Sequence, residues 1–132
     1  MRILLDTHFL LWIFIDSRRL SNTHKSYLLD ESNEIYYSPV SLWEISIKYS
    51  LGKLDLQGIT PEEFYAELTQ SFVKCLPIMN QTLVTGYQLP RLHKDPFDRL
   101  LIWQAIENHF YFLSVDRQTS AYSDHGLLCL NR

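Results

Sequence analysis

This 132-residue sequence has few cysteines and a small net charge, and each of these features argues against a class of protein. The chain has 12 basic and 15 acidic residues and a formal charge of -3, which argues against a protein that coats nucleic acid through bulk positive charge. Its two cysteines, Cys75 and Cys129, are far apart, so neither a zinc knuckle nor a disulfide framework is indicated. We expect both cysteines to pack as small core residues in a reducing cytosol.

A long apolar run is also missing. The apolar stretch near the start is interrupted by Asp6 and His8 and is shorter than the roughly 18 residues that a membrane span requires. No small-residue cleavage site follows it, so the stretch does not indicate a signal peptide. We therefore expect a cytoplasmic protein without a membrane segment.

Turn signals divide the chain into short elements of alternating type, with no internal repeat. Strands that alternate with helices imply an α/β fold in which helices cover both faces of a parallel sheet. The length fits one domain, so we expect residues 1–132 to form a single domain. The expected strands are 2–5, 34–37, 73–76, 110–116 and 127–130, and the expected helices are 7–15, 20–29, 39–51, 60–70, 81–87 and 95–109.

Two aspartates come at the ends of expected strands. Sites in parallel sheets lie beyond the carboxyl ends of the strands, and Asp6 and Asp116 both belong at that edge if their strands are parallel. Ionised side chains are rarely buried unless they are paired or bind a metal. Two simpler interpretations stay open: Asp6 could cap the helix that begins at Thr7, and Asp116 could start a turn before Arg117.

A third acid interrupts the apolar face of the third expected helix. Helical spacing places four residues on this face: Val40, Glu44, Ile47 and Leu51. Glu44 therefore lies in the expected core stripe. The alternative is an exposed ion pair with Lys48 one turn later, which would contribute only about 0.3–0.5 kcal/mol.

A fourth acid lies in the first turn of the helix expected over 95–109. Asp95 is placed to cap this helix and Pro96 occupies its first position, so Asp98 could simply complement the helix dipole. Asp98 also lies within one turn of the helix end that faces the strand termini. There it could join the acids that follow the strands.

Four acids delivered to one end of one sheet imply a counter-charge. Clustered carboxylates repel one another unless protons or cations intervene, and oxygen-only ligands suit a hard divalent cation such as Mg²⁺ or Mn²⁺. Such a site suits phosphodiester hydrolysis, in which the metal activates a water and stabilises charge on phosphate oxygens. No glycine-rich phosphate loop, G-x-S-x-G serine or H-E-x-x-H helix offers a competing catalyst.

Four stretches, in order and with fitting spacings, resemble the successive motifs of PIN-domain ribonucleases, specifically the VapC-type toxins of bacterial toxin–antitoxin pairs. The stretches are LLDTHFLLW, SPVSLWEISIKYSLGKL, LPRLHKDPFDRLLIWQA and FLSVD. The resemblance implies a three-layer α/β/α fold with about five parallel strands in the order 3-2-1-4-5. It also implies a Mg²⁺- or Mn²⁺-dependent endoribonuclease, a homodimer and inhibition by a cognate antitoxin.

The functional residues of that family match six residues of this chain by position. The four catalytic and metal-binding acids match Asp6, Glu44, Asp98 and Asp116, and the two supporting hydroxyls match Thr7 and Ser114. The chain departs from the family pattern at three positions: Ser114 stands where threonine is usual, Trp103 where alanine is common, and His109 near a frequent glycine. The difference at Trp103 bears on local packing and not on the metal chemistry.

Basic residues before and within the last expected helix admit two interpretations. They could line the path of an RNA backbone toward the metal, because phosphate contacts supply affinity without sequence information, or they could belong to a solvated loop. The histidine among them could instead bind the metal. The four residues are Arg91, His93, Lys94 and Arg99.

Two other function classes compete with the ribonuclease. A phosphoacceptor receiver domain or an aspartyl phosphohydrolase would also place an acid after the first strand, but the phosphohydrolase pattern needs a second acid where His8 stands. An inactive protein-binding module of the same fold could be distinguished from the ribonuclease only by an activity assay. The chain has no basic helix of the kind that enters a DNA groove, so we expect it to contact DNA only through an antitoxin.

Overall fold

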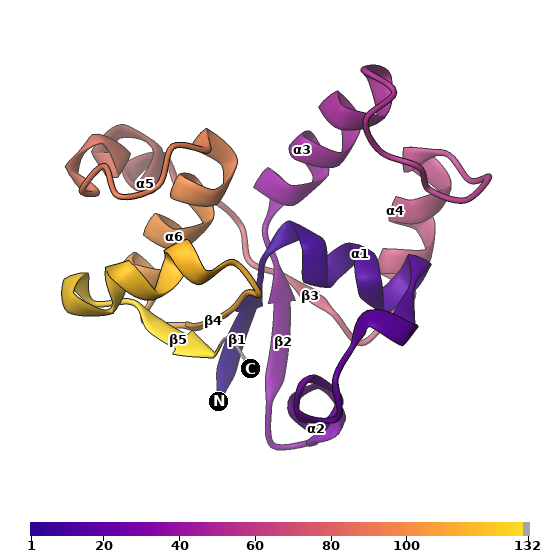
Figure 1. Cartoon of the computed structure of the whole chain (residues 1–132), viewed down its shortest axis with the longest axis horizontal. Helices are drawn as coiled ribbons and strands as arrows, with labels where there is room; N and C mark the ends of the chain where they lie inside the picture. Colours follow the sequence, from indigo (N-terminus) through magenta and orange to yellow (C-terminus); the bar gives the residue numbers. More distant parts are fainter. Residues whose placement is uncertain (131–132) are drawn as a thin grey trace.

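Five parallel strands form the central sheet of the computed structural model, which describes residues 1–130. The strands are β1 (Arg2–Leu5), β2 (Glu34–Tyr37), β3 (Lys74–Cys75), β4 (Tyr111–Leu113) and β5 (Leu128–Leu130). Their order across the sheet is β3-β2-β1-β4-β5 (Figure 1). The expected α/β fold with a five-stranded parallel sheet in the order 3-2-1-4-5 is therefore confirmed.

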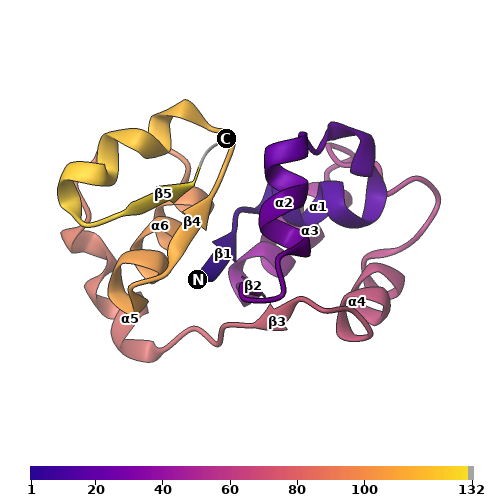
Figure 2. The same ribbon diagram turned by 90° about the horizontal axis from the view of Figure 1, so that it is seen from below.

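Helices cover both faces of this sheet and give the chain three layers. The α-helices are α1 (Thr7–Ile15), α2 (Asn22–Leu29), α3 (Pro39–Ser50), α4 (Pro61–Thr69), α5 (Asn80–Thr85) and α6 (Pro96–Asn108), and 3-10 helices lie at Ser17–Arg19 (η1), Gly86–Gln88 (η2) and Arg117–His125 (η3). Figure 2 shows α1 to α4 gathered on one side, and α5 and α6 on the other. Within residues 1–130, no helix combines the length and the apolar character needed to cross a membrane.

The central strand β1 supplies the core on both faces of the sheet. Ile3 and Leu5 join a buried cluster that includes Phe9 of α1, whereas Leu4 joins a second cluster that includes Leu101 of α6. Successive side chains of a strand point to opposite faces, so one apolar strand serves both layers. Asp6 follows directly at the carboxyl end of this apolar strand.

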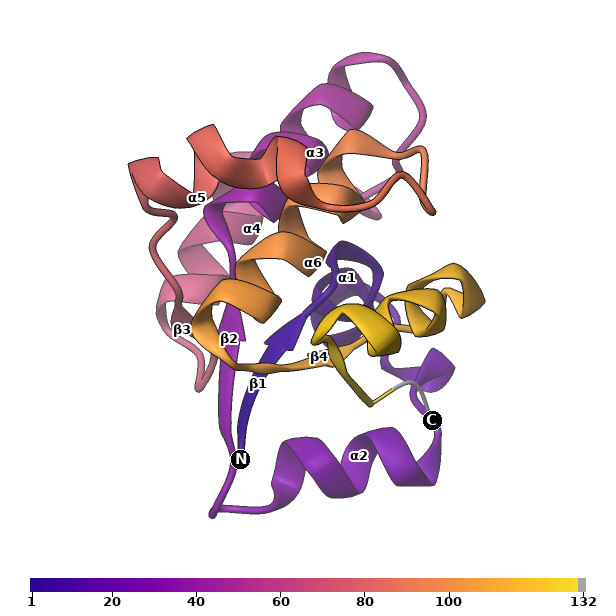
Figure 3. The same ribbon diagram turned by 90° about the vertical axis from the view of Figure 1, so that its left-hand side faces the viewer.

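Three helices begin near the carboxyl edge of the sheet, opposite α2. Figure 3 shows α2 beside the amino-terminal end of β1 and α3 beyond the other end. The Ser38 hydroxyl accepts from the Val40 backbone N–H at 3.1 Å and caps α3 directly after β2. Asp95 caps α6 by accepting from the backbone N–H groups of Phe97 and Asp98 at 2.8 and 3.2 Å. These caps and the start of α1 after β1 bring three helix N-termini to one edge.

The buried face of α3 differs from the expected one at its end. Its buried residues are Val40, Ser41, Glu44 and Ile45. Leu51 is 60% exposed, because the helix ends at Ser50 and the chain turns through Gly52 in the left-handed region (φ +70°). Glu44 is buried as expected, but Leu51 does not extend its apolar stripe.

The prediction that both cysteines pack in the core is wrong for Cys75. Cys75 lies in β3, a two-residue strand at the edge of the sheet, and it is exposed. So short an edge strand leaves its side chains without flanking residues to cover them. Cys129 in β5 is half-buried, and both thiols are free.

Candidate metal centre

Asp6 lies between β1 and α1 at the carboxyl edge of the sheet and is only 3% exposed. Its Oδ1 accepts from the Phe9 backbone N–H at 2.8 Å, so Asp6 caps α1. Its Oδ2 accepts from the Ser114 hydroxyl at 2.7 Å. The same Ser114 oxygen accepts from the Asp116 backbone N–H at 3.0 Å. One hydroxyl therefore links the acid after β1 to the acid after β4, and the capping role of Asp6 does not remove it from the cluster.

Glu44 is 2% exposed and is held from two sides. The Thr7 hydroxyl donates to Glu44 Oε1 at 2.7 Å, and Thr7 Oγ1 is 2.9 Å from the Ser41 hydroxyl. Lys48, one turn later on α3, forms an ion pair with Glu44 Oε2. Partial burial acts to lower the pKa of Lys48, but the hydrogen bond and charge of Glu44 outweigh it and raise that pKa. The ion pair considered from the sequence exists, but its acid is buried.

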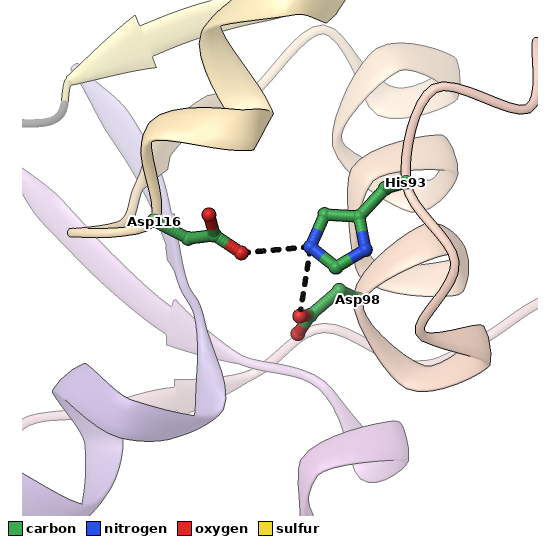
Figure 4. Close-up of side chains that lie close together, drawn as sticks. All are labelled: His93, Asp98 and Asp116. Carbon is green, nitrogen blue, oxygen red and sulfur yellow. Dashed lines mark hydrogen bonds and ion pairs between the residues drawn. The ribbon is translucent and has the colours of Figure 1, made fainter.

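His93 lies between Asp98 and Asp116 (Figure 4). Its Nε2 atom is 2.7 Å from Asp116 Oδ2 and 3.3 Å from Asp98 Oδ2. The His93 side chain is 7% exposed, whereas those of Asp98 and Asp116 are 19% and 31% exposed. One potential ligand atom of each residue lies within 4.8 Å of the other two. The loop before α6 therefore joins the acids of α6 and of the segment after β4.

The pKa of Asp98 is raised to about 7. Burial is the largest cause, because it penalises the ionised carboxylate. Negative charges act in the same direction, and they belong to Asp95, Glu44 and Asp6. The acid that follows β1, the acid of α3 and the acids at the start of α6 thus share one electrostatic environment.

The pKa values of Asp6 and Asp116 are shifted in opposite directions. Burial raises the pKa of Asp6, although hydrogen bonds from Phe9 and Ser114 favour its charged form. Partial burial also acts to raise the pKa of Asp116, but the hydrogen bond from His93 leads the causes that outweigh it, and this pKa is lowered. Titratable groups that neighbours shift in opposite directions are frequent at functional sites.

The four basic residues considered for RNA binding divide into exposed and structural ones. Arg91 and Lys94 are exposed. The Arg99 guanidinium instead donates to the backbone carbonyls of Leu89 and Pro90 at 2.9 and 3.0 Å. Arg99 therefore supports the loop before α6, and His93 is buried in the acid cluster described above.

Tyr122 fixes the same loop from η3, a contact that the sequence did not indicate. Its side chain is fully buried, and its hydroxyl accepts from the backbone N–H groups of Leu92 and His93 at 3.0 and 2.8 Å. The hydroxyl donates to the Pro90 carbonyl at 2.7 Å. A single tyrosine in the polar segment 117–125 produces no periodic pattern, which explains why the sequence gave no expectation for η3.

A hollow of about 210 Å³ opens beside Glu44. Basic side chains contribute to its wall together with apolar ones, and the lining residues are Thr7, His8, Leu11, Glu44, Ile45, Lys48, Lys53 and Leu54. Sequence reasoning missed His8 and Lys53 as neighbours of the acids. The position of His8, two residues after Asp6, was the one available signal.

The donor set fits a hard divalent cation. Both oxygens of Asp6, Glu44 and Asp116 accept one hydrogen bond each, which leaves each oxygen a further lone pair. Within the described residues 1–130 no hydrogen bond to the Asp98 carboxylate is found, and His93 Nε2 lies 3.3 Å from its Oδ2. Carboxylate oxygens are the ligands that Mg²⁺ and Mn²⁺ prefer. Burial and neighbouring negative charges raise the pKa of Asp98, and a cation there would favour its ionised form.

The sheet order and the acid cluster define an α/β protein with a candidate metal centre at the carboxyl ends of its strands. The chain belongs to the PIN-domain family, because the model of that family matches residues 3–124. The resemblance of the four sequence motifs to PIN-domain proteins is thereby confirmed.

Solved structures share this fold at low sequence identity. The complex VapBC2 from Rickettsia felis, bound to a DNA fragment from their promoter, aligns with a TM-score of 0.70 and 17% identity over 99% of this chain and 98% of that chain. DNA-bound VapBC from Salmonella typhimurium has a TM-score of 0.66, 14% identity, and coverage of 98% and 97%. FitAcB from Neisseria gonorrhoeae has a TM-score of 0.66, 19% identity, and coverage of 98% and 96%. No curated protein sequence is significantly similar to the chain.

Proposed function

We propose that this chain is a metal-dependent endoribonuclease of the toxin–antitoxin type, which cleaves RNA phosphodiester bonds at the acid cluster. The observation that carries the proposal is geometric: one potential ligand atom each of His93, Asp98 and Asp116 lies within 4.8 Å of the other two, and Ser114 links Asp116 to the buried Asp6. Carboxylates gathered in this way need a counter-charge, which a divalent cation would supply. Membership of the PIN-domain family supports a nuclease, and the fold shared with the VapBC structures supports a toxin–antitoxin role.

The catalytic and metal-binding roles fall to Asp6, Glu44, Asp98 and Asp116, with Mg²⁺ or Mn²⁺ as the cation. When bound, the cation activates a water and stabilises charge on phosphate oxygens. Thr7 and Ser114 orient Glu44 and Asp6, because each hydroxyl donates to a carboxylate oxygen at 2.7 Å. The pKa of the Asp98 carboxyl is raised to about 7, and this carboxyl would have to be ionised to hold the cation.

In this proposal RNA reaches the acids past basic side chains. Arg91 and Lys94 lie on the loop that carries His93, and Lys48 and Lys53 line the hollow beside Glu44. Contacts to phosphate oxygens hold an RNA strand in place without reading its sequence. Basic side chains close to the acids would allow phosphate contacts there although the whole chain has a net charge of -3.

We further propose a cytoplasmic homodimer that a cognate antitoxin inhibits, and that contacts DNA only through this antitoxin. An antitoxin arginine or lysine could take the place of the cation, since a fixed positive charge satisfies the same oxygens. The ion pair between Lys48 and Glu44 is an example of such a contact within the chain. Exposed apolar side chains offer surface for protein partners, among them Leu29, Trp43, Phe72, Val84 and Tyr87.

Cleavage of single-stranded RNA by the purified chain tests this function. Parallel reactions contain Mg²⁺, Mn²⁺ or EDTA, and DNA of the same sequence serves as the matched substrate. We expect RNA cleavage with either cation, and none in EDTA or with the Asp98→Asn variant. Cleavage that persists both in EDTA and with Asp98→Asn would rule out the proposed site as its source.

An inactive protein-binding module of the same fold is the second candidate. It is favoured by contacts that already satisfy the acids within the chain, such as Lys48 on Glu44 and His93 on Asp116. A module of this kind would bind its antitoxin without cleaving RNA. A folded, antitoxin-binding chain that leaves RNA intact in both Mg²⁺ and Mn²⁺ would select this candidate.

A further inference from the structure

Both ring nitrogens of His93 are engaged, and their contacts determine which nitrogen carries the hydrogen. Nδ1 lies 3.1 Å from the Asp95 backbone nitrogen and accepts its N–H. An accepting ring nitrogen carries no hydrogen, so the hydrogen of the imidazole lies on Nε2. Nε2 is therefore the donor in the 2.7 Å hydrogen bond to Asp116 Oδ2.

A histidine that binds a metal has the reverse arrangement. Its ligating nitrogen is free of hydrogen, and its other nitrogen donates an N–H to a carbonyl, a carboxylate or water. The other nitrogen of His93 instead faces a donor, the Asp95 N–H. Binding a metal through Nε2 would move the ring hydrogen to Nδ1 and direct it against that N–H. The proximity of His93, Asp98 and Asp116 is therefore insufficient to make the histidine a ligand.

The surrounding structure holds the His93 ring in this orientation. Its side chain is 7% exposed, and its backbone N–H donates to the Tyr122 hydroxyl at 2.8 Å. Asp95, which supplies the contact to Nδ1, is also the N-cap of α6. Turning the ring over would put carbon where Nδ1 now accepts from Asp95. The ring, its loop and the start of α6 thus form one connected arrangement.

We propose that His93 is a positioning residue of the metal centre and not one of its ligands: its Nε2–H donates to Asp116 and holds that carboxylate at a fixed distance from Asp98. This inference rests on the proposed function and deepens it by defining the ligand chemistry. A centre with oxygen ligands favours the hard cations Mg²⁺ and Mn²⁺, whereas an imidazole ligand would add affinity for Zn²⁺.

Nitrogen-15 NMR of the histidine rings tests the hydrogen position in the metal-free protein and after Mg²⁺ is added to saturation. We expect His93 to carry its hydrogen on Nε2 in both states. His24 is an internal reference, because its Nδ1 also accepts a backbone N–H, that of Ser21, at 3.1 Å. A hydrogen on Nδ1 of His93 without metal, or loss of the Nε2 hydrogen when Mg²⁺ binds, would overturn the proposal.

Calorimetric Mg²⁺ titrations of two variants separate a donor from a ligand. His93→Gln keeps an N–H donor and should bind Mg²⁺ as wild type does. His93→Ala removes the donor and should bind Mg²⁺ roughly 10–100-fold more weakly, the usual loss when a partner of a metal ligand is removed. His109→Gln is the matched control, because His109 caps the opposite end of α6 from Asp98. Equal loss in His93→Gln and His93→Ala would overturn the positioning role.

Failure of the proposed function gives a different result. A wild-type protein that binds neither Mg²⁺ nor Mn²⁺ and cleaves no RNA would reject the nuclease. The ring hydrogen of His93 in the metal-free protein is measured independently of that outcome, and it decides the donor role in either case.

Discussion

Neutralising Asp98 should stabilise the metal-free protein at alkaline pH. Folding raises the pKa of this carboxyl from 3.8 to about 7, so the ionised form is less favourable in the folded chain than in the unfolded chain. Each pKa unit corresponds to about 1.4 kcal/mol, which gives an upper bound of about 4 kcal/mol when the carboxyl is fully ionised. The Asp98 side chain is 19% exposed, and solvent reduces this cost. We expect Asp98→Asn to unfold with a free energy about 2–4 kcal/mol higher than wild type at about pH 8 in EDTA.

The stabilisation by Asp98→Asn should depend on pH with a defined sign. At pH values below about 4 the carboxyl is protonated in both states, so its ionisation adds no penalty. As the pH rises from about 4 to about 7, the unfolded chain releases this proton before the folded chain does, and wild type loses stability. Above the folded-state pKa the loss is complete. The advantage of Asp98→Asn should therefore grow across this window and then level off.

Urea unfolding in EDTA at a series of pH values measures this difference. Asp124→Asn is the matched control, because Asp124 is an exposed carboxylate, and it should change stability by less than about 0.5 kcal/mol. Saturating Mg²⁺ should stabilise wild type more than Asp98→Asn, because in the proposed site Asp98 is a ligand and the cation binds only the folded protein. An advantage of Asp98→Asn that is absent at about pH 8, or that shrinks as the pH rises, would refute the electrostatic reasoning.

Three further predictions concern the acids and their partners. Asp6→Asn should lose RNA cleavage, and should also lose any growth arrest that expression of the wild-type chain causes in cells, while its circular dichroism spectrum stays that of wild type. Unchanged cleavage by the purified variant would count against the cluster. Ser114→Ala removes the hydroxyl that joins Asp6 to the Asp116 N–H, and should lower the free energy of unfolding by about 1–3 kcal/mol in urea, whereas the exposed Ser123→Ala should change it by less than about 0.5 kcal/mol. Equal losses would show that the link is not specific. In an Mn²⁺ titration of a fixed amount of the complex between this chain and its antitoxin, inhibition of RNA cleavage should weaken as Mn²⁺ rises, because in the proposed mechanism an antitoxin cation and the metal compete for the same carboxylates. Complete inhibition at every Mn²⁺ concentration, with the antitoxin bound far from Asp6 and Asp98, would contradict this mechanism.

The parts of the fold and site that follow local rules could be predicted from the sequence. Asp6 and Asp116 come just after apolar strands, and parallel geometry alone brings the ends of such strands to one edge. Ser38 with Pro39, and Asp95 with the proline after it, mark the starts of two helices by standard capping chemistry. The order of the strands required the family resemblance, because alternation of helices and strands does not fix which strands are neighbours.

Contacts between distant side chains could not be predicted in this way. Arginine is a residue type that often binds phosphate, but the folded loop places two backbone carbonyls within hydrogen-bonding distance of Arg99. Tyr122 gives no pattern in a polar segment, although its hydroxyl makes three hydrogen bonds to one loop. The orientation of His93 depends on the backbone N–H of Asp95, which only the folded loop defines. These contacts depend on backbone geometry that residue types do not specify.

RNA cleavage by the Asp98→Cys variant in different cations tests most directly whether a metal at Asp98 drives the reaction. A thiolate is a soft ligand that binds Mg²⁺ poorly and binds Cd²⁺ or Zn²⁺ well. The expected result is no cleavage by Asp98→Cys in Mg²⁺ and recovered cleavage in Cd²⁺ or Zn²⁺, while Asp98→Ala stays inactive in every cation. Cleavage by Asp98→Cys in Mg²⁺ at the wild-type rate, or a rate that does not depend on the cation, would contradict a metal held by Asp98.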